Sequence, residues 1–533
     1  MTVKNARKLG FFAALAMLVG SVVGVGIFFK NGSIQRVTES QGITWLLSWV
    51  IGGIISLIVA INFSEISFLK PSKLNGLSNW LYRSGGKKIG YFTSFSYAFF
   101  YYPILAMTLG VILSEVLVFF IGVAAGKDIS LPYYAHFLIG SSFILCYLIL
   151  NHFSIKISGW LALVTTVLKF VPLIFALILG LALANTHIVE PNSNKLTNAF
   201  NNTTFDISKL ILALPAVLFA YDSFLSIGLF QKKVVNPRKT VPRTLVISMI
   251  IIVTVYSLIA LSSVFHNSGS ISGIISDVFE KEVADPVNIV VTFFLLISVV
   301  GVTNAVSSAT LIQMQDQTRI KTVFGVRFLA KKLGETKASW ILLALNFLFW
   351  ILVIQVPSLA APFLTTARTE TGVPIPGKFT TGTGTDVLLD YMSNAPTVFF
   401  FVLYGLSLAT YSLRRNKIAN PKNRHNTIIF HTITIIGISV IAIMEIAYIY
   451  SLIAAFVNKP WASSGAGIFA DNGLILPWTY AFVVFIVQFF MFVGLPVVNY
   501  LLIKGIEKRD IIKQFSHLVE LTPEELEQEG FEF

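Results

Sequence analysis

The chain has 533 residues and a mass of 58.8 kDa; 55% of its residues are hydrophobic, 12% are charged, and the mean hydropathy is +0.77. The charged fraction is about half the roughly 25% that is typical of soluble domains. It leaves too little polar surface for the several soluble cores that this length would otherwise predict. The composition therefore excludes an ordinary soluble protein and indicates a polytopic membrane protein.

The net charge of +13 and the pI of about 9.5 have two readings. A basic chain can bind nucleic acid, but in a membrane protein positive charge gathers in the cytoplasmic loops. We favour the second reading and expect no nucleic-acid partner. Cys146 is the single cysteine, so no disulfide within the chain is expected.

Twelve apolar runs are long enough to cross the hydrocarbon core of a membrane, which takes ~20 residues for ~30 Å. They are continuous rather than alternating, which predicts helices and not barrel strands. The first follows a basic start without a cleavage site, so we interpret it as a retained span. The runs cover residues 10–29, 43–66, 90–122, 134–151, 157–184, 208–230, 243–265, 285–314, 339–360, 394–413, 427–457 and 475–504.

Loop charge predicts the orientation. With the N-terminus inside, 29 Lys and Arg residues fall in inside segments and 9 in outside segments, while Lys169 lies within a span. One miscounted span would invert every later loop and destroy this asymmetry. The sequence therefore predicts twelve spans, with residues 1–9 and 505–533 both cytoplasmic.

Enzyme and cofactor motifs are missing from the sequence. It contains no P-loop, Gly24-Val25-Gly26 lacks the third glycine of a dinucleotide fingerprint, and the seven histidines form no H-x-x-x-H pair. One cysteine cannot form a thiolate metal site. We therefore expect no enzyme activity, no cofactor and no metal site.

Two spans contain residues that interrupt a helix. Span 1 has Gly20, Gly24 and Gly26 within seven residues, which either allow close helix packing or break the helix at depth. Span 6 contains Pro215 and the intramembrane acid Asp222. Broken helices at corresponding positions of two halves indicate an inverted-repeat transporter. We therefore predict repeats over residues 10–184 and 208–413, with two additional spans over 427–504.

Lys169 lies about twelve residues into span 5, roughly 18 Å deep at ~1.5 Å per residue. An isolated ammonium there is costly, so it must be paired, neutral or facing a wet cavity. It is either a structural lysine bound to backbone carbonyls or a titrating group that replaces a cation. Glu65, at the inner end of span 2, is either a gate residue or a surface acid. The tail around Thr522 has a capping-box pattern and is either solvated or docked.

These patterns together resemble the amino acid–polyamine–organocation (APC) superfamily, in particular its amino acid permeases. The resemblance covers roughly residues 10–320. It rests on residues 20–28 (GSVVGVGIF), 45–66 ending in Ser-Glu-Ile, 150–159 (LNHFSIKISG) followed by Lys169, 219–224 (FAYDSF) and 235–243 (VNPRKTVPR). Val25 replaces a serine that is frequent in the family, and the end of span 8 also departs from the family pattern.

The resemblance implies a LeuT-type fold, which is all-α, with five-plus-five inverted repeats and two further helices. It also implies a substrate site. The substrate carboxylate would meet N–H groups at Gly24, Val25 and Gly26, and its ammonium would meet carbonyls near Val22, Phe219 and Ala220. Tyr221 and Phe224 would gate the site or pack against the substrate. For coupling, the candidate residues are Lys169 in place of a sodium ion, Ser307 or Ser308 as its partner, and Asp222.

We therefore expect an amino acid transporter of the cell membrane that works by alternating access, with proton coupling or exchange instead of sodium coupling. Two other functions stay open: transport of polyamines or other organic cations, and a transporter-like sensor. The sequence names neither the preferred amino acid nor the oligomeric state.

Overall fold

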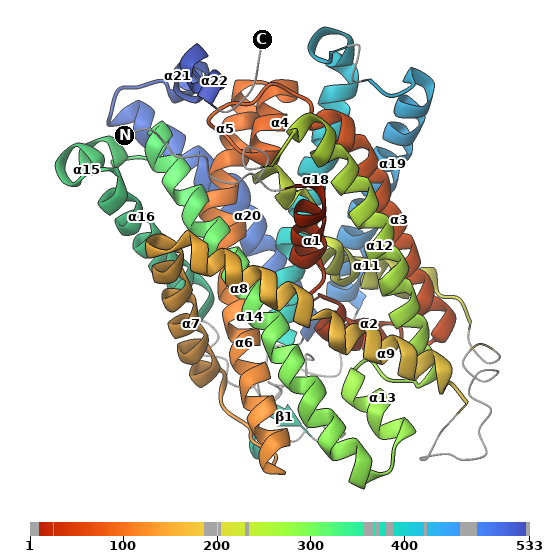
Figure 1. The fold of residues 1–533 in the computed structure, drawn as a ribbon. Coiled ribbons are helices and arrows are strands. Elements are labelled where there is room, and N and C mark those ends of the chain that lie inside the picture. The colour runs from red at the N-terminus through yellow and green to blue at the C-terminus, as the bar shows by residue number, and fades with distance from the viewer. Residues whose placement is uncertain are drawn as a thin grey trace.

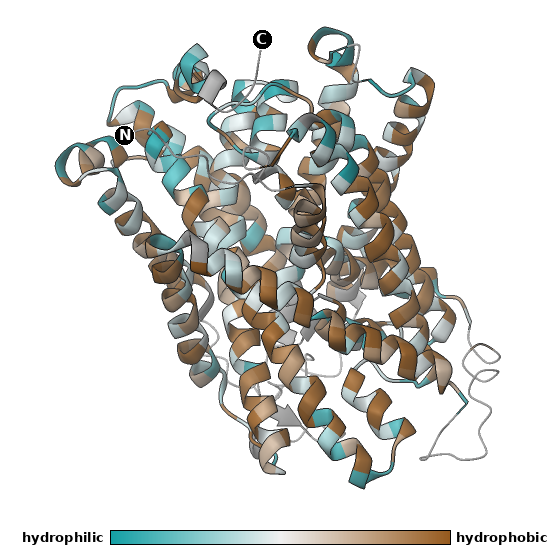
Figure 2. Cartoon of the chain, in the orientation of Figure 1, coloured by the Kyte–Doolittle hydropathy of each residue, from teal (hydrophilic) through white to brown (hydrophobic). Residues whose placement is uncertain are grey.

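The computed structural model describes residues 10–24, 26–185, 200, 204–229, 234–355, 366–368, 374–379, 387–420, 424–458 and 477–528. Within these residues twelve helical segments are long and apolar enough to cross a membrane. Each coincides with one of the expected spans, so the all-α, twelve-span prediction is confirmed. Figure 2 shows hydrophobic residues along the middle of the bundle, with hydrophilic residues gathered most clearly at its upper end.

The spans of the first half are built from these elements: α1 (Phe11–Val22), η1 (Gly26–Lys30) and α2 (Asn31–Val37) in span 1; α3 (Gly42–Ile66) in span 2; α5 (Lys87–Ser96), η2 (Tyr97–Tyr101) and α6 (Tyr102–Ala125) in span 3; α7 (Tyr133–Phe153) in span 4; α8 (Ile155–Leu168) and α9 (Phe170–Ala182) in span 5.

The remaining spans are α11 (Ile207–Tyr221) with η3 (Phe224–Leu229), α12 (Pro237–Phe265), α14 (Lys281–Ile320), α16 (Glu335–Trp350) with η5 (Ile351–Gln355), α18 (Val387–Ile418), α19 (Thr427–Asn458) and α20 (Pro477–Gly505). Shorter helices between or after the spans are α4 (Gly76–Gly85), α13 (Ile271–Val278), α15 (Val326–Leu333), α21 (Ile511–Val519) and α22 (Pro523–Gln528). β1 (Thr366–Arg368) and β2 (Pro374–Phe379) form an antiparallel pair between spans 9 and 10, which the sequence did not predict.

Corresponding spans of the two halves pack against each other. Span 1 contacts span 6 through α1 with η3 and η1 with α11, span 2 contacts span 7 through α3 with α12, and span 3 contacts span 8 through α6 with α14. Spans 1, 2 and 3 therefore each meet the span five places later. This pairing is expected when two five-span repeats of opposite orientation face each other across a pseudo-twofold axis.

The short helices mark the two ends of the bundle. Figure 1 shows α4, α15, α21 and α22 at the upper end, and α13 and β1 at the lower end. The upper end thus carries the segments that the sequence analysis assigned to the inside. The lower end carries those assigned to the outside.

The C-terminal tail is docked, which was one of the two alternatives from the sequence. The expected capping box is present: the Glu525 N–H donates to Thr522 Oγ1 (3.2 Å), and the Thr522 N–H donates to Glu525 Oε2 (3.0 Å). Phe515 of α21 is fully buried against Tyr82 and Tyr91. The tail therefore packs against α4 and the start of span 3.

Glu520 connects the tail to α4 by charge. Arg83 donates two hydrogen bonds to its carboxylate, at 2.6 and 2.8 Å, and the Tyr82 hydroxyl donates a third at 2.7 Å. Burial by itself raises the pKa of Glu520, but the hydrogen bonds from Arg83 and Tyr82 outweigh burial, so the pKa is lowered from 4.5. Because the docked tail stabilises the carboxylate, docking favours the ionised form of Glu520.

We expect tail docking to weaken in acid and in the variant Arg83→Met. Because docking lowers the pKa of Glu520, its carboxylate stabilises the docked tail at pH values above its ordinary pKa of 4.5. This stabilisation is lost as the pH falls through the lower pKa of the docked state. The protection factors of the α21 amides, which correct for the intrinsic pH dependence of exchange, should therefore fall in Arg83→Met at neutral pH, and in the wild type only once the pH is below the ordinary value of 4.5. Arg327→Met, on the exposed face of α15, is the matched control. Unchanged protection in Arg83→Met would contradict this role for the ion pair.

Candidate functional site

Span 1 is interrupted at the expected depth. α1 ends at Val22, and Val23 has an extended backbone with ψ of 111°. Helical structure resumes at Gly26 with one π-helical turn, η1, and continues as α2. The predicted break in span 1 is confirmed, while Val25 lies outside the described residues.

Span 6 is interrupted beside it. α11 ends at Tyr221, and Asp222 is extended with ψ of 176°. Ser223 then has a φ of +71°, in the left-handed region that residues with a side chain seldom occupy. The chain continues as the 3₁₀ segment η3. The predicted break in span 6 is also confirmed, and Asp222 lies at that break.

The two breaks are in direct backbone contact. A Cβ atom added to Gly26 would lie 2.4 Å from Ala220 Cα, so only glycine allows this approach. The hydroxyl groups of Ser21 and Ser226 are 2.9 Å apart, which joins the end of α1 to η3. The glycines of span 1 therefore serve both alternatives from the sequence: they allow a break and a close packing contact.

Lys169 binds the carbonyl end of α1. Its ammonium donates to the carbonyl oxygens of Gly20 and Val23, the latter at 2.9 Å, and the side chain is 1% exposed. These carbonyls belong to the last turn before the break, where the helix dipole is negative, so a cation is favoured there. Span 5 turns at Lys169, and Pro172 lacks the N–H that would bond the Leu168 carbonyl.

Lys169 does not form the expected bond to span 8. No hydrogen bond among the described residues joins it to Ser307 or Ser308. Instead, Thr165 of the preceding turn packs against Gly301 of span 8, where an added Cβ would lie 2.2 Å from Thr165 Oγ1. Span 8 is thus close to this part of span 5, but the ammonium is held by span 1.

A π-helical turn in span 3 aims a tyrosine at Asp222. Pro103 cannot donate to the Phe99 carbonyl, and that carbonyl instead accepts a hydrogen bond from the Trp350 indole at 2.7 Å. The turn over Tyr97–Tyr101 closes through a bond from the Tyr102 N–H to the Tyr97 carbonyl, five residues back. Such π turns are frequent at functional sites.

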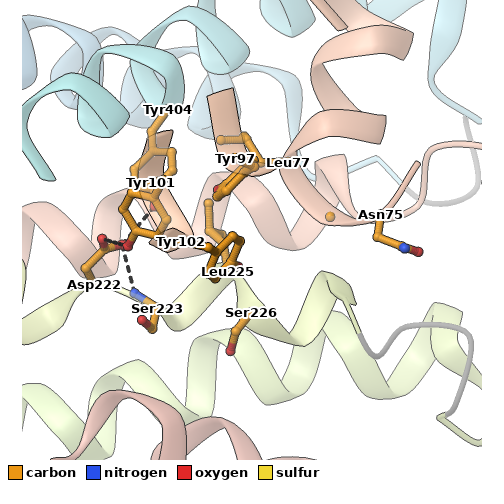
Figure 3. A pocket seen from close by; sticks show the side chains of 11 residues that line it. Asn75, Leu77, Tyr97, Tyr101, Tyr102, Asp222, Ser223, Leu225, Ser226 and Tyr404 are labelled. Carbon is orange, nitrogen blue, oxygen red and sulfur yellow. Dashed lines mark hydrogen bonds between the residues drawn. The ribbon is translucent and has the colours of Figure 1, made fainter. Parts of the chain in front are cut away.

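Asp222 is buried and receives three hydrogen bonds. The Tyr101 hydroxyl donates to Oδ2, and the Tyr404 hydroxyl and the Ser223 N–H each donate to Oδ1 at 2.8 Å. Figure 3 shows Tyr101, Tyr404 and Ser223 converging on this carboxylate. The acid is therefore held at the meeting point of spans 3, 6 and 10.

Two small cavities meet at Tyr101, Asp222 and Ser223. Cavity 1, of about 20 Å³, extends from these residues towards α4 and is the one drawn in Figure 3; the rest of its lining is Asn75, Gly76, Leu77, Tyr97, Tyr102, Leu225, Ser226 and Tyr404. Cavity 2, of about 30 Å³, lies between the two breaks and spans 3 and 8; the rest of its lining is Ser21, Val22, Gly26, Leu105, Leu109, Phe219, Val302 and Val306. Each has room for one or two water-sized spheres.

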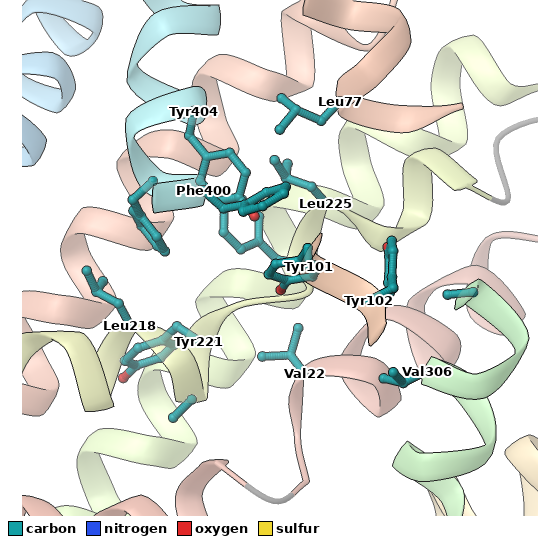
Figure 4. Packing of buried hydrophobic residues seen from close by; sticks show 14 of the residues in the cluster. Val22, Leu77, Tyr101, Tyr102, Leu218, Tyr221, Leu225, Val306, Phe400 and Tyr404 are labelled. Carbon is teal, nitrogen blue, oxygen red and sulfur yellow. The ribbon is translucent and has the colours of Figure 1, made fainter. Parts of the chain in front are cut away.

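The aromatic residues around the cavities form one packed cluster. Tyr101 packs against Tyr97, Tyr102 and Phe400, with ring centroids 4.3–5.5 Å apart. Figure 4 shows Tyr101, Tyr102 and Phe400 of this cluster together with Val22 and Leu225 from the two interrupted spans. Cavity 2 holds only water-sized space, so a larger molecule could enter it only if these side chains moved apart.

The predicted substrate residues divide into two groups. Val22, Gly26 and Phe219 line cavity 2, as does the predicted coupling residue Asp222. Gly24, Ala220, Tyr221 and Phe224 line neither cavity. Tyr221 points away, because its hydroxyl donates to the Trp49 carbonyl at 3.1 Å and its ring packs on span 2. The Val22 carbonyl, expected to meet an ammonium, accepts a bond from the Tyr256 hydroxyl at 3.0 Å.

Sequence reasoning missed two buried cations that it had assigned to loops. Lys30 is 4% exposed within span 1, and Arg415 is 1% exposed within span 10. Both lie next to the expected span boundaries, where an apolar run gives way to polar residues. It also missed Tyr101 and Tyr404, because tyrosines are common in apolar spans and nothing in sequence pairs them with Asp222.

Glu65 forms a buried ion pair with Arg415, so the surface-acid alternative is wrong. Arg415 donates to both carboxylate oxygens, at 2.6 and 2.9 Å, and each side chain is at most 2% exposed. The Tyr411 hydroxyl and the His425 N–H also donate to Glu65, at 3.0 and 2.8 Å. The guanidinium lies 4.4 Å from the Phe430 ring centroid. This network joins spans 2, 10 and 11 on the side of the expected inner surface.

Comparison with known proteins agrees with these features. A family model described as amino acid permease matches residues 9–499. The chain is 24% identical over 250 residues to a serine/threonine exchanger of Bacillus subtilis, covering 47% of this chain and 53% of the relative. It is 24% identical over 306 residues to a mouse b(0,+)-type amino acid transporter, covering 57% and 61%. It thus spans about half to three fifths of the length of these relatives.

Among solved structures, a manganese transporter of Eremococcus coleocola aligns over 92% of this chain and 95% of its own. The TM-score is 0.49 and the sequences are 11% identical.

We expect Gly26→Ala to destabilise the protein. The added methyl group would lie 2.4 Å from the Ala220 backbone, and overpacking of this kind typically costs about 1–3 kcal/mol. Thermal unfolding in detergent measures the loss. Gly494→Ala in α20 is the control, because its Cβ would meet nothing within 4 Å. Equal melting temperatures for the two variants would contradict the backbone contact.

We also expect Arg415→Met to lower the free energy of unfolding by about 3–5 kcal/mol, because it leaves the Glu65 carboxylate buried without its cation. Lys417→Met, an exposed position on the same helix, should have little effect. Adding Glu65→Gln to Arg415→Met should restore part of the loss, since the unpaired charge is removed. Additive losses in the double variant would argue against a coupled pair.

Proposed function

The chain belongs to the amino acid permease family, and we propose that it is a secondary active transporter that moves amino acids across the cell membrane by alternating access. The observation that supports this most directly is the contact of two interrupted helices at Gly26 and Ala220, beside a central cavity and a buried lysine. We propose that both termini and the upper end of the bundle are cytoplasmic, and the charge asymmetry of the loops supports this orientation.

We infer that the amino acid binds at the two breaks. The first N–H groups of a helix have no partner within it and attract negative charge. The start of η1, around Gly24, Val25 and Gly26, would therefore receive the substrate carboxylate. The substrate ammonium would lie at the end of α11, near the carbonyls of Phe219 and Ala220, which are close to Gly26 in space.

Lys169 is proposed as the group that replaces a coupling sodium ion. Its ammonium already bonds the Gly20 and Val23 carbonyls at the end of α1, which are oxygen ligands that a sodium ion would otherwise use. A second cation in the same place would be repelled. Coupling to protons or exchange of one amino acid for another is therefore favoured over sodium coupling, with Asp222 as the second candidate coupling group.

Exchange has separate support from a relative. The Bacillus subtilis relative is described as a serine/threonine exchanger, and we propose small neutral amino acids as the first substrates to test. A thermal-shift screen of the twenty amino acids and of polyamines would identify ligands, because a ligand that binds the folded state stabilises it according to its occupancy. Stabilisation only by polyamines lacking a carboxylate would overturn the amino acid proposal.

We predict that Lys169→Ala reduces uptake of a radiolabelled amino acid into proteoliposomes about 10-fold or more, because the carbonyls of the broken helix lose their cation. Lys209→Ala is the control; that lysine pairs with Glu39 at the lower end, away from both cavities. Wild-type uptake should respond to a pH gradient or to amino acid inside the vesicles, and should not need sodium. Sodium-dependent uptake that ignores both, or normal uptake by Lys169→Ala, would contradict the proposed coupling.

A further inference from the structure

A short basic helix lies where the chain turns back into the membrane. α15 ends at Leu333, and after the single residue Gly334 the chain continues as α16, the first element of span 9. Figure 1 shows α15 beside the start of α16 at the outer edge of the upper end. Trp340 follows in the second turn of α16, and tryptophan is enriched at the level of lipid headgroups. α15 therefore lies at the membrane surface.

α15 has two different sides. Its apolar side packs on the bundle through Val326, which is fully buried, and through Leu329. The opposite side is exposed and carries three cations and one aromatic ring, namely Arg327, Phe328, Lys331 and Lys332. Because residues three or four positions apart are neighbours on a helix, these four side chains form one surface. A basic, amphipathic helix of this kind is suited to lie along a membrane.

The three cations of this surface are free to bind an anion. Within the described part of the chain, no hydrogen bond or ion pair engages the charged groups of Arg327, Lys331 and Lys332. The Lys332 ammonium lies 5.9 Å from the centroid of the neighbouring Phe328 ring. Residues 326–337 contain four basic side chains and a single acidic one, Glu335. The positive charge of α15 is therefore not neutralised by the chain itself.

The start of α15 is held in place by the end of span 12 and the residues after it. The Gly325 N–H donates to Glu507 Oε1 at 2.7 Å, and the Phe324 N–H donates to Asn499 Oδ1 at 2.9 Å. Gly325 and Gly334 have φ of +75° and +83°, which lets the chain change direction at both ends of the helix. The cations therefore lie on a fixed segment, and a fixed segment loses less conformational entropy when it binds a ligand.

Phe328 favours a lipid over a free anion as the occupant. Its ring is 68% exposed although it lies among the cations. Transfer of such a ring from water into an apolar environment is favourable, and an inorganic anion offers no such environment. A phospholipid offers both parts, because its phosphate is negative and its acyl chains are apolar. The leaflet beside span 9 brings such molecules to α15.

We propose that α15 forms a binding site for an anionic phospholipid of the leaflet at the upper end. Arg327, Lys331 and Lys332 bind the phosphate and the other oxygens of the headgroup, and the Phe328 ring enters the boundary between headgroups and acyl chains. None of these residues lines either cavity. The lipid site is therefore independent of the proposed substrate site.

The test compares phosphatidylglycerol, which is anionic, with phosphatidylcholine of the same acyl chains, which carries no net charge. Thermal shift of the full-length protein in detergent, titrated with each lipid, measures the two apparent affinities. The wild type should prefer phosphatidylglycerol roughly 10-fold or more, since each basic residue near a membrane surface contributes about fivefold. Equal affinities for the two lipids, or the same stabilisation by inorganic phosphate, would overturn the inference.

The triple variant Arg327→Gln, Lys331→Gln, Lys332→Gln should reduce this preference to less than about threefold, because only the headgroup loses its partners. Without lipid it should melt at the wild-type temperature, since all three side chains are exposed. The charge-retaining variant Arg327→Lys, Lys331→Arg, Lys332→Arg should keep the preference.

A matched control removes three exposed lysines from other segments assigned to the inside, through Lys88→Gln, Lys417→Gln and Lys513→Gln. This control should keep the preference for phosphatidylglycerol. An equal loss in the control would show that net charge alone attracts the lipid, and it would overturn the site on α15. If the triple variant does not fold, Lys331→Gln and Lys332→Gln decide singly: each should lower the preference about fivefold, and an unchanged preference in both would refute the site.

Discussion

The constraint on which this structure depends is the need to satisfy backbone polar groups inside the membrane. An unbroken span bonds its own N–H and carbonyl groups, but a span that stops at mid-depth exposes the ends of two half-helices. In span 1 the free carbonyl groups at the end of α1 are satisfied by Lys169, whose ammonium donates to the Gly20 and Val23 carbonyl oxygens. The buried lysine and the broken helix therefore explain each other, because each would be costly alone.

The same logic recurs in the spans around the breaks. Pro103 has no N–H to bond the Phe99 carbonyl of span 3, and the Trp350 indole N–H of span 9 donates a hydrogen bond to it instead. The resulting π turn directs Tyr101 at Asp222, the residue that ends the first half of span 6. The interrupted hydrogen-bond pattern in span 3 thus orients Tyr101. The side chain that bonds the free carbonyl also joins two spans that are far apart in sequence.

Charged side chains join spans at both ends of the bundle. On the upper side Glu65 and Arg415 form a buried, fully bonded pair that joins spans 2, 10 and 11, and the tail adds Glu520 and Arg83 near the surface. On the lower side Lys30 donates to Ser393 and Asn394 of span 10 and lies beside the Phe219 ring of span 6. A bidentate ion pair is hard to separate in a low dielectric. The Glu65–Arg415 pair therefore holds spans 2, 10 and 11 together at the upper end.

The sequence by itself determined the number of spans, their boundaries to within eight residues, and the positions of both breaks. These depend on local properties: run length, glycine and proline within a run, and an isolated charge in an apolar stretch. Only the tertiary structure decided the partners. Lys30 and Arg415 look like loop charges from their neighbours in sequence, Tyr101 and Tyr404 look like ordinary span residues, and Tyr221 was expected at the site but faces span 2. Each of these contacts joins residues more than a hundred positions apart. The pattern of residues within one span does not indicate which of its faces another span will cover.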